Sequence, residues 1–269
     1  MYLAIPLKKP EEIEATQRSA LLVSKTLAEL TKFLKPGITT LRLDQLAEEF
    51  IQDHKAIPAF KGYNGFPASL CTSVNDAVVH GIPGKYVIKE EDIISIDCGV
   101  LLDGWYGDSA YTFILKGASE KKIELCKTTL ESLEKSITFV APEKTVGDLG
   151  HFIQKYAESR GFSVVRELVG HGIGRQLHEA PEIPNYGNPG KGVLLREGMV
   201  FAIEPMINEG KRFVKTLSDN WTVVTADGKA SAHYEHTVAV VKSGLQKLSS
   251  FSEIESNIKL NPHLVSING

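Results

Sequence analysis

The spacing of apolar residues predicts two helices at the start of the chain. Over residues 10–35 they recur at helical intervals, and this stretch begins with a proline and two glutamates and stops at Pro36-Gly37. Proline and acidic residues favour the first turn of a helix, and a Pro-Gly pair interrupts one. After a cap at Thr39 or Thr40, a second apolar stripe has the i, i+3, i+4 and i+7 spacing of a helix. We therefore expect two helices joined by a Pro-Gly turn.

A similar pattern occurs once more downstream. The shift that superimposes Pro36 on Pro142 also superimposes the cap Thr39 on Thr145 and brings the apolar helical positions into register. Helix pairs can resemble each other by chance, so the segments that follow them decide between coincidence and duplication.

Segments typical of β-strands follow both helix pairs. Residues 92–100 and 105–115 flank an Asp-Gly pair, which is a strong short-range signal for a hairpin. Another such pair, Asp227-Gly228, lies among the corresponding segments of the second half, where we expect the same arrangement. Those segments are 199–203, 221–225 and 232–241.

Two helices followed by antiparallel strands, used twice without a Ser/Gly-rich linker, predict one α+β domain of two related halves. We expect this single domain to comprise residues 1–269, with residues 1–10 as an N-terminal arm and residues 246–269 as a polar surface tail. A pseudo-twofold axis would then bring equivalent residues of the two halves together.

Composition and charge narrow the class of protein. The chain has 269 residues, of which 42% are hydrophobic, and no apolar run approaches the ~20 residues of a membrane-spanning helix. The first ten residues lack the long apolar segment of a secretory signal, so we expect a cytoplasmic protein. The 30 basic and 33 acidic residues argue against a main affinity for nucleic acid. Three widely separated cysteines without CxxC spacing predict reduced thiols rather than disulfides or a thiolate zinc site.

Two aspartates occupy the predicted first hairpin. Asp97 lies inside an apolar strand, and Asp108 lies in the partner strand. With a two-residue Asp-Gly turn, Asp108 is opposite Gly99 on the face that carries Asp97. The aspartates are then diagonal neighbours, with Cα atoms roughly 7–8 Å apart and side chains able to converge. Their like charges would repel each other.

The second half repeats this placement of acidic residues. Glu204 ends one apolar strand, and Glu235 lies in another. Each acid alone could pair with a lysine or arginine, but no basic residue lies within four positions of Asp97 or Asp108. Four buried carboxylates are costly unless they are neutralised or bind cations. Two divalent ions would balance their charge.

A neutral imidazole could complete such a site. His80, His171 and His178 lie among glycines, which let backbone and ligand approach closely. His233 and His236 flank the last of the four acids and are interpreted as supporting or ordinary strand residues. Oxygen-rich ligation with one histidine suits Mn, Fe(II), Co or Zn, and two ions about 3.5–4 Å apart activate a bridging water for hydrolysis. Surface positions are expected for His54, His151 and His263.

With these residues in this order, the chain resembles the type I methionine aminopeptidases, which have the pita-bread fold, over residues 8–245. The resemblance implies a curved antiparallel sheet flanked by helices, with two halves related by a pseudo-twofold axis. It also implies removal of the N-terminal methionine from nascent proteins, with a preference for a small second residue. The compact bacterial form is the better match, because we expect neither a zinc-binding N-terminal extension nor the type II helical insertion. The matching stretches are NDAVVHGIP (75–83), IDCGVLLDGWYGDSA (96–110), GHGIGRQLHEAP (170–181), FAIEP (201–205) and YEHTVAV (234–240).

The same resemblance implies roles for individual residues. Asp97 and Glu235 would be the bridging ligands, and Glu204 would also accept the proton of the attacking water. His178 would donate a hydrogen bond to the scissile carbonyl oxygen or to the oxyanion of the intermediate, and His80 would contact the substrate near the scissile nitrogen. The residues that would bind two divalent ions of cobalt, manganese, iron or zinc are Asp97, Asp108, His171, Glu204 and Glu235.

A methionine pocket and a monovalent cation are implied in the same way. Leu177 stands where the family usually has an aromatic residue, so the sequence does not fix how tightly the pocket encloses methionine. A monovalent cation would bind near Asn75 and Ser231. The implied partners are the N-termini of nascent polypeptides. We expect a monomer. Docking on the ribosome would suit an enzyme that acts on emerging chains. The other implied pocket residues are Tyr63, Phe66, Cys71 and Trp221, whose soft and aromatic side chains favour contacts with sulfur.

Two alternatives stay open at this point. Xaa-Pro peptidases share the fold but usually carry a large N-terminal domain and further histidines around the site. Metal-free relatives bind ribosomes or other partners without cleaving them. The retention of all five ligand types together with His80 and His178 favours a working peptidase.

Overall fold

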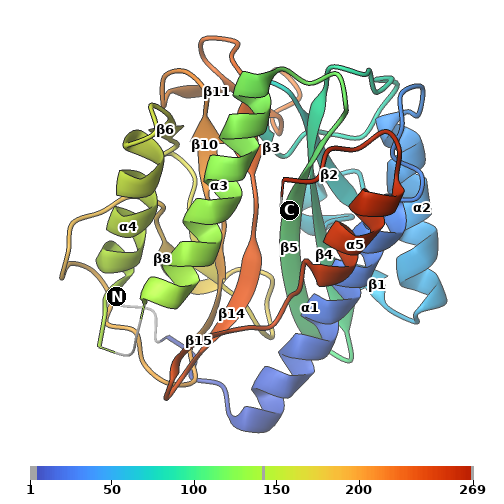
Figure 1. The fold of residues 1–269 in the computed structure, drawn as a ribbon. Helices are drawn as coiled ribbons and strands as arrows, with labels where there is room; N and C mark the ends of the chain where they lie inside the picture. Colours follow the sequence, from blue (N-terminus) through green and yellow to red (C-terminus); the bar gives the residue numbers. More distant parts are fainter. Residues whose placement is uncertain (1–4, 141–142, 268–269) are drawn as a thin grey trace.

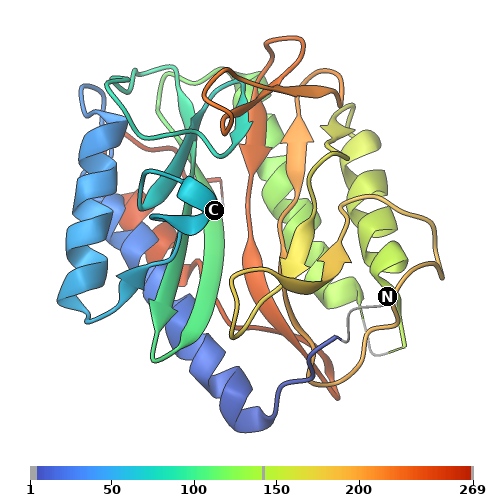
Figure 2. The ribbon, with the colours of Figure 1, turned by 180° about the vertical axis from the view of Figure 1, so that it is seen from behind.

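Helices cover one face of the molecule and antiparallel strands form the other, in a computed structural model that describes residues 5–140 and 143–267. Figure 1 shows the long helices in front of the strands, and Figure 2 shows the strands from the opposite side. Within these two ranges every pairing between named strands is antiparallel. In the same two ranges no helix is long and apolar enough to cross a membrane.

The two predicted helix pairs are present, and equivalent threonines cap their second members. Thr39 accepts a hydrogen bond from the backbone N–H of Arg42, and Thr145 accepts one from that of Asp148. The residues that the repeat superimposes therefore have the same structural role. Pro142, the second proline of the repeat, lies outside the described residues. The helices are α1 (Pro10–Leu30), α2 (Thr40–Asp53), α3 (Glu120–Phe139) and α4 (Val146–Glu158).

The strands of the first half are β1 (Ile57–Pro58), β2 (Leu70–Val74), β3 (Ala77–Val79), β4 (Ile93–Leu102) and β5 (Trp105–Ile114). β4 and β5 form the predicted hairpin, and β1 and β2 pair with the other edge of β4. Asp103 and Gly104 have φ angles of 51° and 77°, as the favoured two-residue turn requires. The register pairs Gly99 with Asp108, so Asp97 and Asp108 share one face as predicted.

The second half forms a five-stranded sheet in the order β15-β14-β9-β7-β8 and a smaller one in the order β13-β10-β6. β12 pairs with β11 and β3, whereas β13 pairs with β10, so the hairpin expected at Asp227-Gly228 is wrong. The expected strand 232–241 is interrupted before His236, which leaves Glu235 between two strands. The strands are β6 (Ser163–Val164), β7 (Gly170–Gly172), β8 (Glu179–Ile183), β9 (Val200–Ile203), β10 (Met206–Asn208), β11 (Val214–Thr216), β12 (Val223–Thr225), β13 (Ser231–His233), β14 (His236–Val241) and β15 (Gly244–Lys247).

Hydrogen bonds join the two halves where β5 runs beside the junction of β13 and β14. The Glu235 N–H donates to the Ala110 carbonyl over 2.9 Å, and the Ser109 hydroxyl donates to the Glu235 carbonyl over 2.6 Å. The Thr237 hydroxyl donates to the Asp108 carbonyl over 2.7 Å. These bonds fix the backbone at Asp108 and at Glu235. Two acidic residues from distant parts of the chain are thereby held side by side.

The end of the chain differs from the expected surface tail, residues 246–269. It contains α5 (Ser252–Leu260), which packs against α1 with Ile254 and Ile258 buried. These two isoleucines are four residues apart and therefore share one helix face, but they lie in an otherwise polar segment. Residues 1–4 of the expected N-terminal arm and the last two residues of the tail lie outside the described ranges. That the whole chain is one catalytic domain stays a prediction.

The three cysteines are free and buried, which agrees with the expected reduced thiols. Cys98 and Cys126 lie in the main apolar core between the helices and the strands, and Cys71 lies in a smaller apolar cluster with Leu177. The smaller cluster adjoins the site described next.

Candidate active site

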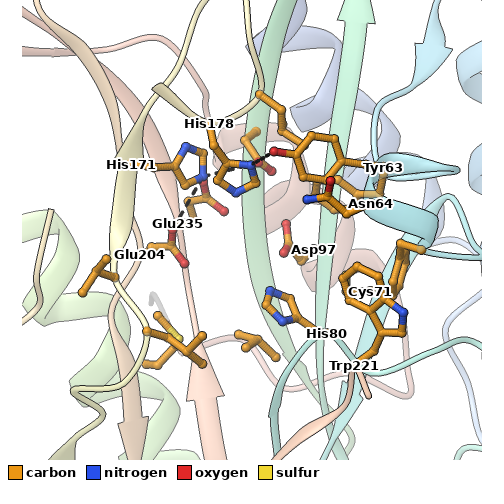
Figure 3. A pocket seen from close by; sticks show the side chains of 18 residues that line it. Tyr63, Asn64, Cys71, His80, Asp97, His171, His178, Glu204, Trp221 and Glu235 are labelled. Carbon is orange, nitrogen blue, oxygen red and sulfur yellow. Dashed lines mark hydrogen bonds and ion pairs between the residues drawn. The ribbon is translucent and has the colours of Figure 1, made fainter. Parts of the chain in front are cut away.

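A cavity of about 380 Å³ lies between the two halves and collects most of the predicted functional residues (Figure 3). It is lined by all the residues predicted to bind divalent metal, which are Asp97, Asp108, His171, Glu204 and Glu235. It is also lined by those predicted to bind substrate, which are Tyr63, Phe66, Cys71, His80, Leu177, His178 and Trp221. No lysine or arginine is among the described residues that line it. The acidic side chains therefore have no basic partner inside the cavity.

The two aspartates of the first hairpin interact directly. Each has one carboxylate oxygen, Oδ1, that is buried and has no hydrogen-bond partner among residues 5–140 and 143–267. Burial raises the pKa of Asp97 to about 7, although a hydrogen bond from Asp108 opposes the shift. Burial, followed by the charges of Asp97 and Glu204, raises the pKa of Asp108 well above its usual value. Two carboxylates this close cannot both be ionised cheaply without a cation.

The two glutamates face the aspartates from the second half. Glu204 follows β9, and its backbone carbonyl accepts a hydrogen bond from the Asn185 side chain over 2.9 Å. Glu235 is 2% exposed, and its Oε1 has no hydrogen-bond partner among the residues that the structure describes. Burial raises the pKa of both glutamates well above the usual value, and Asp97 adds to the shift of Glu204. Asp108 is the largest charged contributor to the shift of Glu235.

His171 supplies a nitrogen donor on strand β7, which lies between β9 and β8. Its Nδ1 lies 3.0 Å from the Gly172 carbonyl, so this nitrogen carries the proton and Nε2 is left with a lone pair. Nε2 lies 3.7 Å from Glu204 Oε1 and 3.9 Å from Asp108 Oδ2. Burial lowers the pKa of His171 to about 3, so the ring is neutral. It can bind a cation but cannot neutralise the acids.

The glycines beside His171 allow β7 to lie between β8 and β9. A Cβ atom at Gly170 would come within 2.4 Å of the Ala202 carbonyl oxygen, and one at Gly172 within 2.3 Å of that of Ala180. Any side chain at either position would push the strands apart. The glycines of the GHG motif therefore serve close packing around the histidine rather than phosphate binding.

The donor atoms form two groups that each suit a cation. Ligand atoms of Asp108, His171 and Glu235 lie within 4.8 Å of one another, and so do those of Asp97, His233 and Glu235. Glu235 is common to both groups, as a bridging ligand would be, whereas Asp97 belongs to one. The bridging role expected for Asp97 stays a prediction. Orphaned buried oxygens and clustered acids without a basic partner fit divalent metal ions.

His233 is the residue that sequence reasoning underestimated. It ends β13, and the structure brings its ring into the group with Asp97 and Glu235. His236, its neighbour in the sequence, has hydrogen-bond partners elsewhere, at Ser249 and Glu134. Both histidines flank Glu235 in an apolar strand-like context. No local signal in the sequence separates the two.

Two further histidines stand at the cavity. His178 Nδ1 lies 2.8 Å from the Tyr63 hydroxyl, and its ring centroid is 4.1 Å from that of His171. His80 has a φ of 57°, in the left-handed region, which is uncommon outside glycine and asparagine. Burial lowers the pKa of both His178 and His80, with the charge of His178 adding to the shift of His80.

Aromatic and apolar side chains form the wall beside this polar cluster. The rings of Phe66 and Trp221 meet edge to face with centroids 5.1 Å apart. Asp219 holds the backbone at Trp221 by accepting a hydrogen bond from the Trp221 N–H over 2.9 Å. Leu177 is buried in the same wall. The predicted pocket residues are thus together. The lining also includes Val79, from the stretch NDAVVHGIP, and five residues outside the matching stretches, which are Phe60, Asn64, Leu168, Val169 and Met206.

Asn75 and Ser231 lie together outside the cavity. The Ser231 N–H donates to the Asn75 carbonyl over 2.8 Å. The side-chain oxygen of Asn75 accepts a hydrogen bond from the Lys122 ammonium over 2.8 Å, and the Ser231 hydroxyl donates to Asn208 over 2.8 Å. The Asn75 oxygen is thus occupied by an ammonium group, whereas the Ser231 oxygen donates its proton and keeps lone pairs that a cation could use. That cation stays a prediction.

The fold and the donor groups fit a metal-dependent hydrolase. Comparison with known families identifies which one. The sequence model of metallopeptidase family M24 matches residues 14–242. The chain therefore belongs to metallopeptidase family M24.

Comparison with individual proteins places the chain within this family. It is 52% identical over 242 residues to methionine aminopeptidase 1 of Bacillus subtilis, covering 90% of this chain and 98% of that protein. It is also 52% identical to the methionine aminopeptidase of Clostridium perfringens, over 91% of this chain and 98% of the relative. The chain is of the bacterial methionine aminopeptidase type, which confirms the resemblance carried by its motifs.

Solved structures confirm the pita-bread fold. The crystal structure of methionine aminopeptidase from Thermotoga maritima superimposes with a TM-score of 0.90 at 46% identity, covering 92% of this chain and 100% of that one. The enzyme from Rickettsia prowazekii gives the same TM-score at 42% identity and the same coverage. The prolidase from Pyrococcus horikoshii, at 20% identity and a TM-score of 0.73, covers 91% of this chain and 63% of that one. It shares the fold alone.

Proposed function

We propose that this protein hydrolyses the first peptide bond of polypeptides that begin with methionine and prefers a small second residue. The observation that carries the proposal is a cluster of four acids beside an apolar, aromatic pocket, with no lysine or arginine among the described residues of its lining. The names of the relatives above support the same activity. As substrates we propose the N-termini of nascent proteins, with a monomeric enzyme acting in the cytoplasm. Ribosome docking and a monovalent cation near Asn75 and Ser231 remain part of the prediction.

Metal ions would bind to the acidic cluster. When bound, divalent ions lower the pKa of a coordinated water and polarise the scissile carbonyl. Cobalt, manganese, iron or zinc would suit the mixed oxygen and nitrogen donors. The proposed ligands of two ions are Asp97, Asp108, His171, Glu204 and Glu235.

Glu204 is the proposed general base. Its side chain is 14% exposed, at the edge of the acidic cluster, and Oε1 lies 3.7 Å from His171 Nε2. Burial raises its pKa well above the usual value, and the proposed metal ions would oppose this shift by favouring the ionised carboxylate, the form that accepts a proton. Glu204 would take a proton from the attacking water and pass it towards the leaving amine.

His178 and His80 are proposed to contact the substrate. The Tyr63 hydroxyl lies 2.8 Å from His178 Nδ1 and fixes the ring, which leaves Nε2 for a hydrogen bond to the scissile carbonyl oxygen. His80 lies on the side of Trp221, with ring centroids 6.5 Å apart. From there it would contact the substrate near the scissile nitrogen, while the side chain of methionine enters the apolar wall.

Cleavage of short peptides tests the proposed function. The purified protein should release methionine from Met-Ala-Ser when Co²⁺ or Mn²⁺ is supplied and should stop after chelation. Met-Gly should be cleaved faster than Met-Leu in the same assay. Turnover of Ala-Pro alone would favour a prolyl peptidase, and turnover of no peptide would favour a binding protein. Activity that survives thorough chelation would overturn the metal mechanism.

The Leu177→Phe variant tests the methionine pocket. Because the cavity of about 380 Å³ has room beside Leu177, a phenylalanine should add an aromatic contact to the methionine sulfur worth about 0.3–1.5 kcal/mol. The ratio of kcat/KM for Met-Ala-Ser to that for Leu-Ala-Ser should rise about two- to tenfold. Leu260→Phe, at an 82% exposed leucine, is the control and should not change the ratio. An unchanged ratio in Leu177→Phe would show that this position does not select methionine.

A further inference from the structure

His233 is a buried histidine whose ring nitrogens make no well-formed hydrogen bond in the described part of the chain. The residue is 1% exposed, and neither Nδ1 nor Nε2 has a partner at ordinary hydrogen-bond geometry, although the Pro205 carbonyl lies close to the ring. Buried polar groups in native proteins almost always have a partner, so each exception calls for an explanation. His236 shows the ordinary arrangement, because its Nδ1 lies 2.6 Å from the Ser249 hydroxyl and its Nε2 lies 3.1 Å from Glu134 Oε1.

The ring of His233 is held against the acidic cluster. Nε2 lies 4.0 Å from Glu235 Oε2, too far for a hydrogen bond. Ligands of one metal ion at about 2.0–2.2 Å each lie roughly 3–4 Å apart, so this separation is close to that of two donors around a cation. The Thr112 hydroxyl accepts a hydrogen bond from the His233 N–H over 3.0 Å and donates to its carbonyl over 2.7 Å. The backbone at His233 is therefore fixed by β5.

The chemistry of the ring also suits a ligand. A neutral imidazole carries a lone pair on one of its two ring nitrogens, which is the form in which histidine binds a metal ion. With this residue, both donor groups have the same composition of one aspartate, one histidine and the shared Glu235.

We propose that His233 is a further ligand of the metal centre and binds, through a ring nitrogen, the cation held by Asp97 and Glu235. The inference rests on the proposed metal-dependent function. It places one imidazole on each side of the centre, His171 in one donor group and His233 in the other. A second nitrogen donor shifts preference away from Mn²⁺ and Mg²⁺ towards Co²⁺, Zn²⁺ and Fe²⁺.

Titration of the metal-depleted full chain with Co²⁺ tests this ligand. Isothermal titration calorimetry should show affinity at one site falling about tenfold or more in His233→Gln, with a smaller loss for Mn²⁺. His54→Gln, at an exposed histidine of the α2 C-terminus, is the matched control and should bind like the wild type. Thermal unfolding of the metal-free variants separates loss of a ligand from loss of fold, and His233→Asn provides a second substitution.

The spectrum of the Co²⁺-loaded protein gives a readout that does not depend on activity. Proton NMR of the wild type should show two hyperfine-shifted imidazole N–H signals, and His233→Gln or His233→Asn should lose one of them. A wild-type protein with a single shifted imidazole signal would overturn the proposal, and so would variants with unchanged affinity and signals. A wild-type chain that binds no Co²⁺ would instead defeat the proposed function itself.

Discussion

Replacement of Glu204 by glutamine is expected to lower kcat for Met-Ala-Ser by about 10²–10⁴-fold, the usual contribution of a positioned general base. Glutamine has the shape of glutamate but cannot accept the proton of the attacking water. The fold should persist, because the hydrogen bond from Asn185 reaches the backbone carbonyl of Glu204 rather than its side chain. Rates are measured at saturating Co²⁺, so that a weakened metal site is not mistaken for a lost base.

Glu182→Gln is the matched control for this variant. Glu182 is an exposed glutamate on β8 that pairs in register with His171, and it does not line the cavity. Its replacement removes one negative charge near the site without removing a proposed metal ligand, so activity should stay within about twofold of wild type. If Glu204→Gln kept more than about a tenth of the wild-type kcat with metal bound, another group would have to be the base.

Asp97→Asn is expected to change activity and stability in opposite directions. Loss of a charged ligand should lower the rate at least ~100-fold. In the metal-depleted protein the same change removes a carboxyl group whose pKa is raised by burial to about 7, and each pKa unit of that shift corresponds to about 1.4 kcal/mol of unfavourable energy for the ionised form. Burial and the neighbouring acids raise the pKa values of this cluster, because the ionised carboxylates are unfavourable there.

Urea unfolding with and without Co²⁺ measures this second effect. The wild type should gain stability on adding metal, because an ion that binds only the folded state stabilises it. Asp97→Asn should begin from a higher free energy of unfolding and gain less from metal. Asp103→Asn is the control, since this aspartate lies at the β4–β5 turn in a left-handed conformation that asparagine also adopts. A metal-depleted Asp97→Asn protein less stable than wild type would contradict the proposed electrostatic cost.

The first hairpin was predictable because its signals are local. Asp-Gly between two apolar runs fixes both the turn and the register, so the shared face of Asp97 and Asp108 follows from the sequence alone. The duplicated helix pairs were predictable for a similar reason, since Thr39 and Thr145 cap helices by contacts within three residues. The hairpin predicted at Asp227-Gly228 was wrong, because β12 pairs with β11 and β3 whereas β13 pairs with β10.

Features that depend on distant contacts were not predictable. α5 is helical because Ile254 and Ile258 are buried against α1, and two apolar residues in a polar segment do not identify such a contact. His233 and His236 have similar neighbours in the sequence, yet only His233 turns its ring to the acidic cluster. His236 reaches Glu134 of α3 and Ser249, whereas His233 lies beside Asp97 of β4 and Glu235. Contacts between the two halves therefore decide which of the two histidines reaches the acidic cluster.

A crystal grown in manganese, with anomalous diffraction collected at the manganese edge, tests the central claim most directly. Two peaks are expected between the halves, within bonding distance of Asp97, Asp108, His171, Glu204 and Glu235. Peaks absent from the cavity, with these side chains turned away from one another into solvent, would show that the acidic cluster does not hold divalent metal.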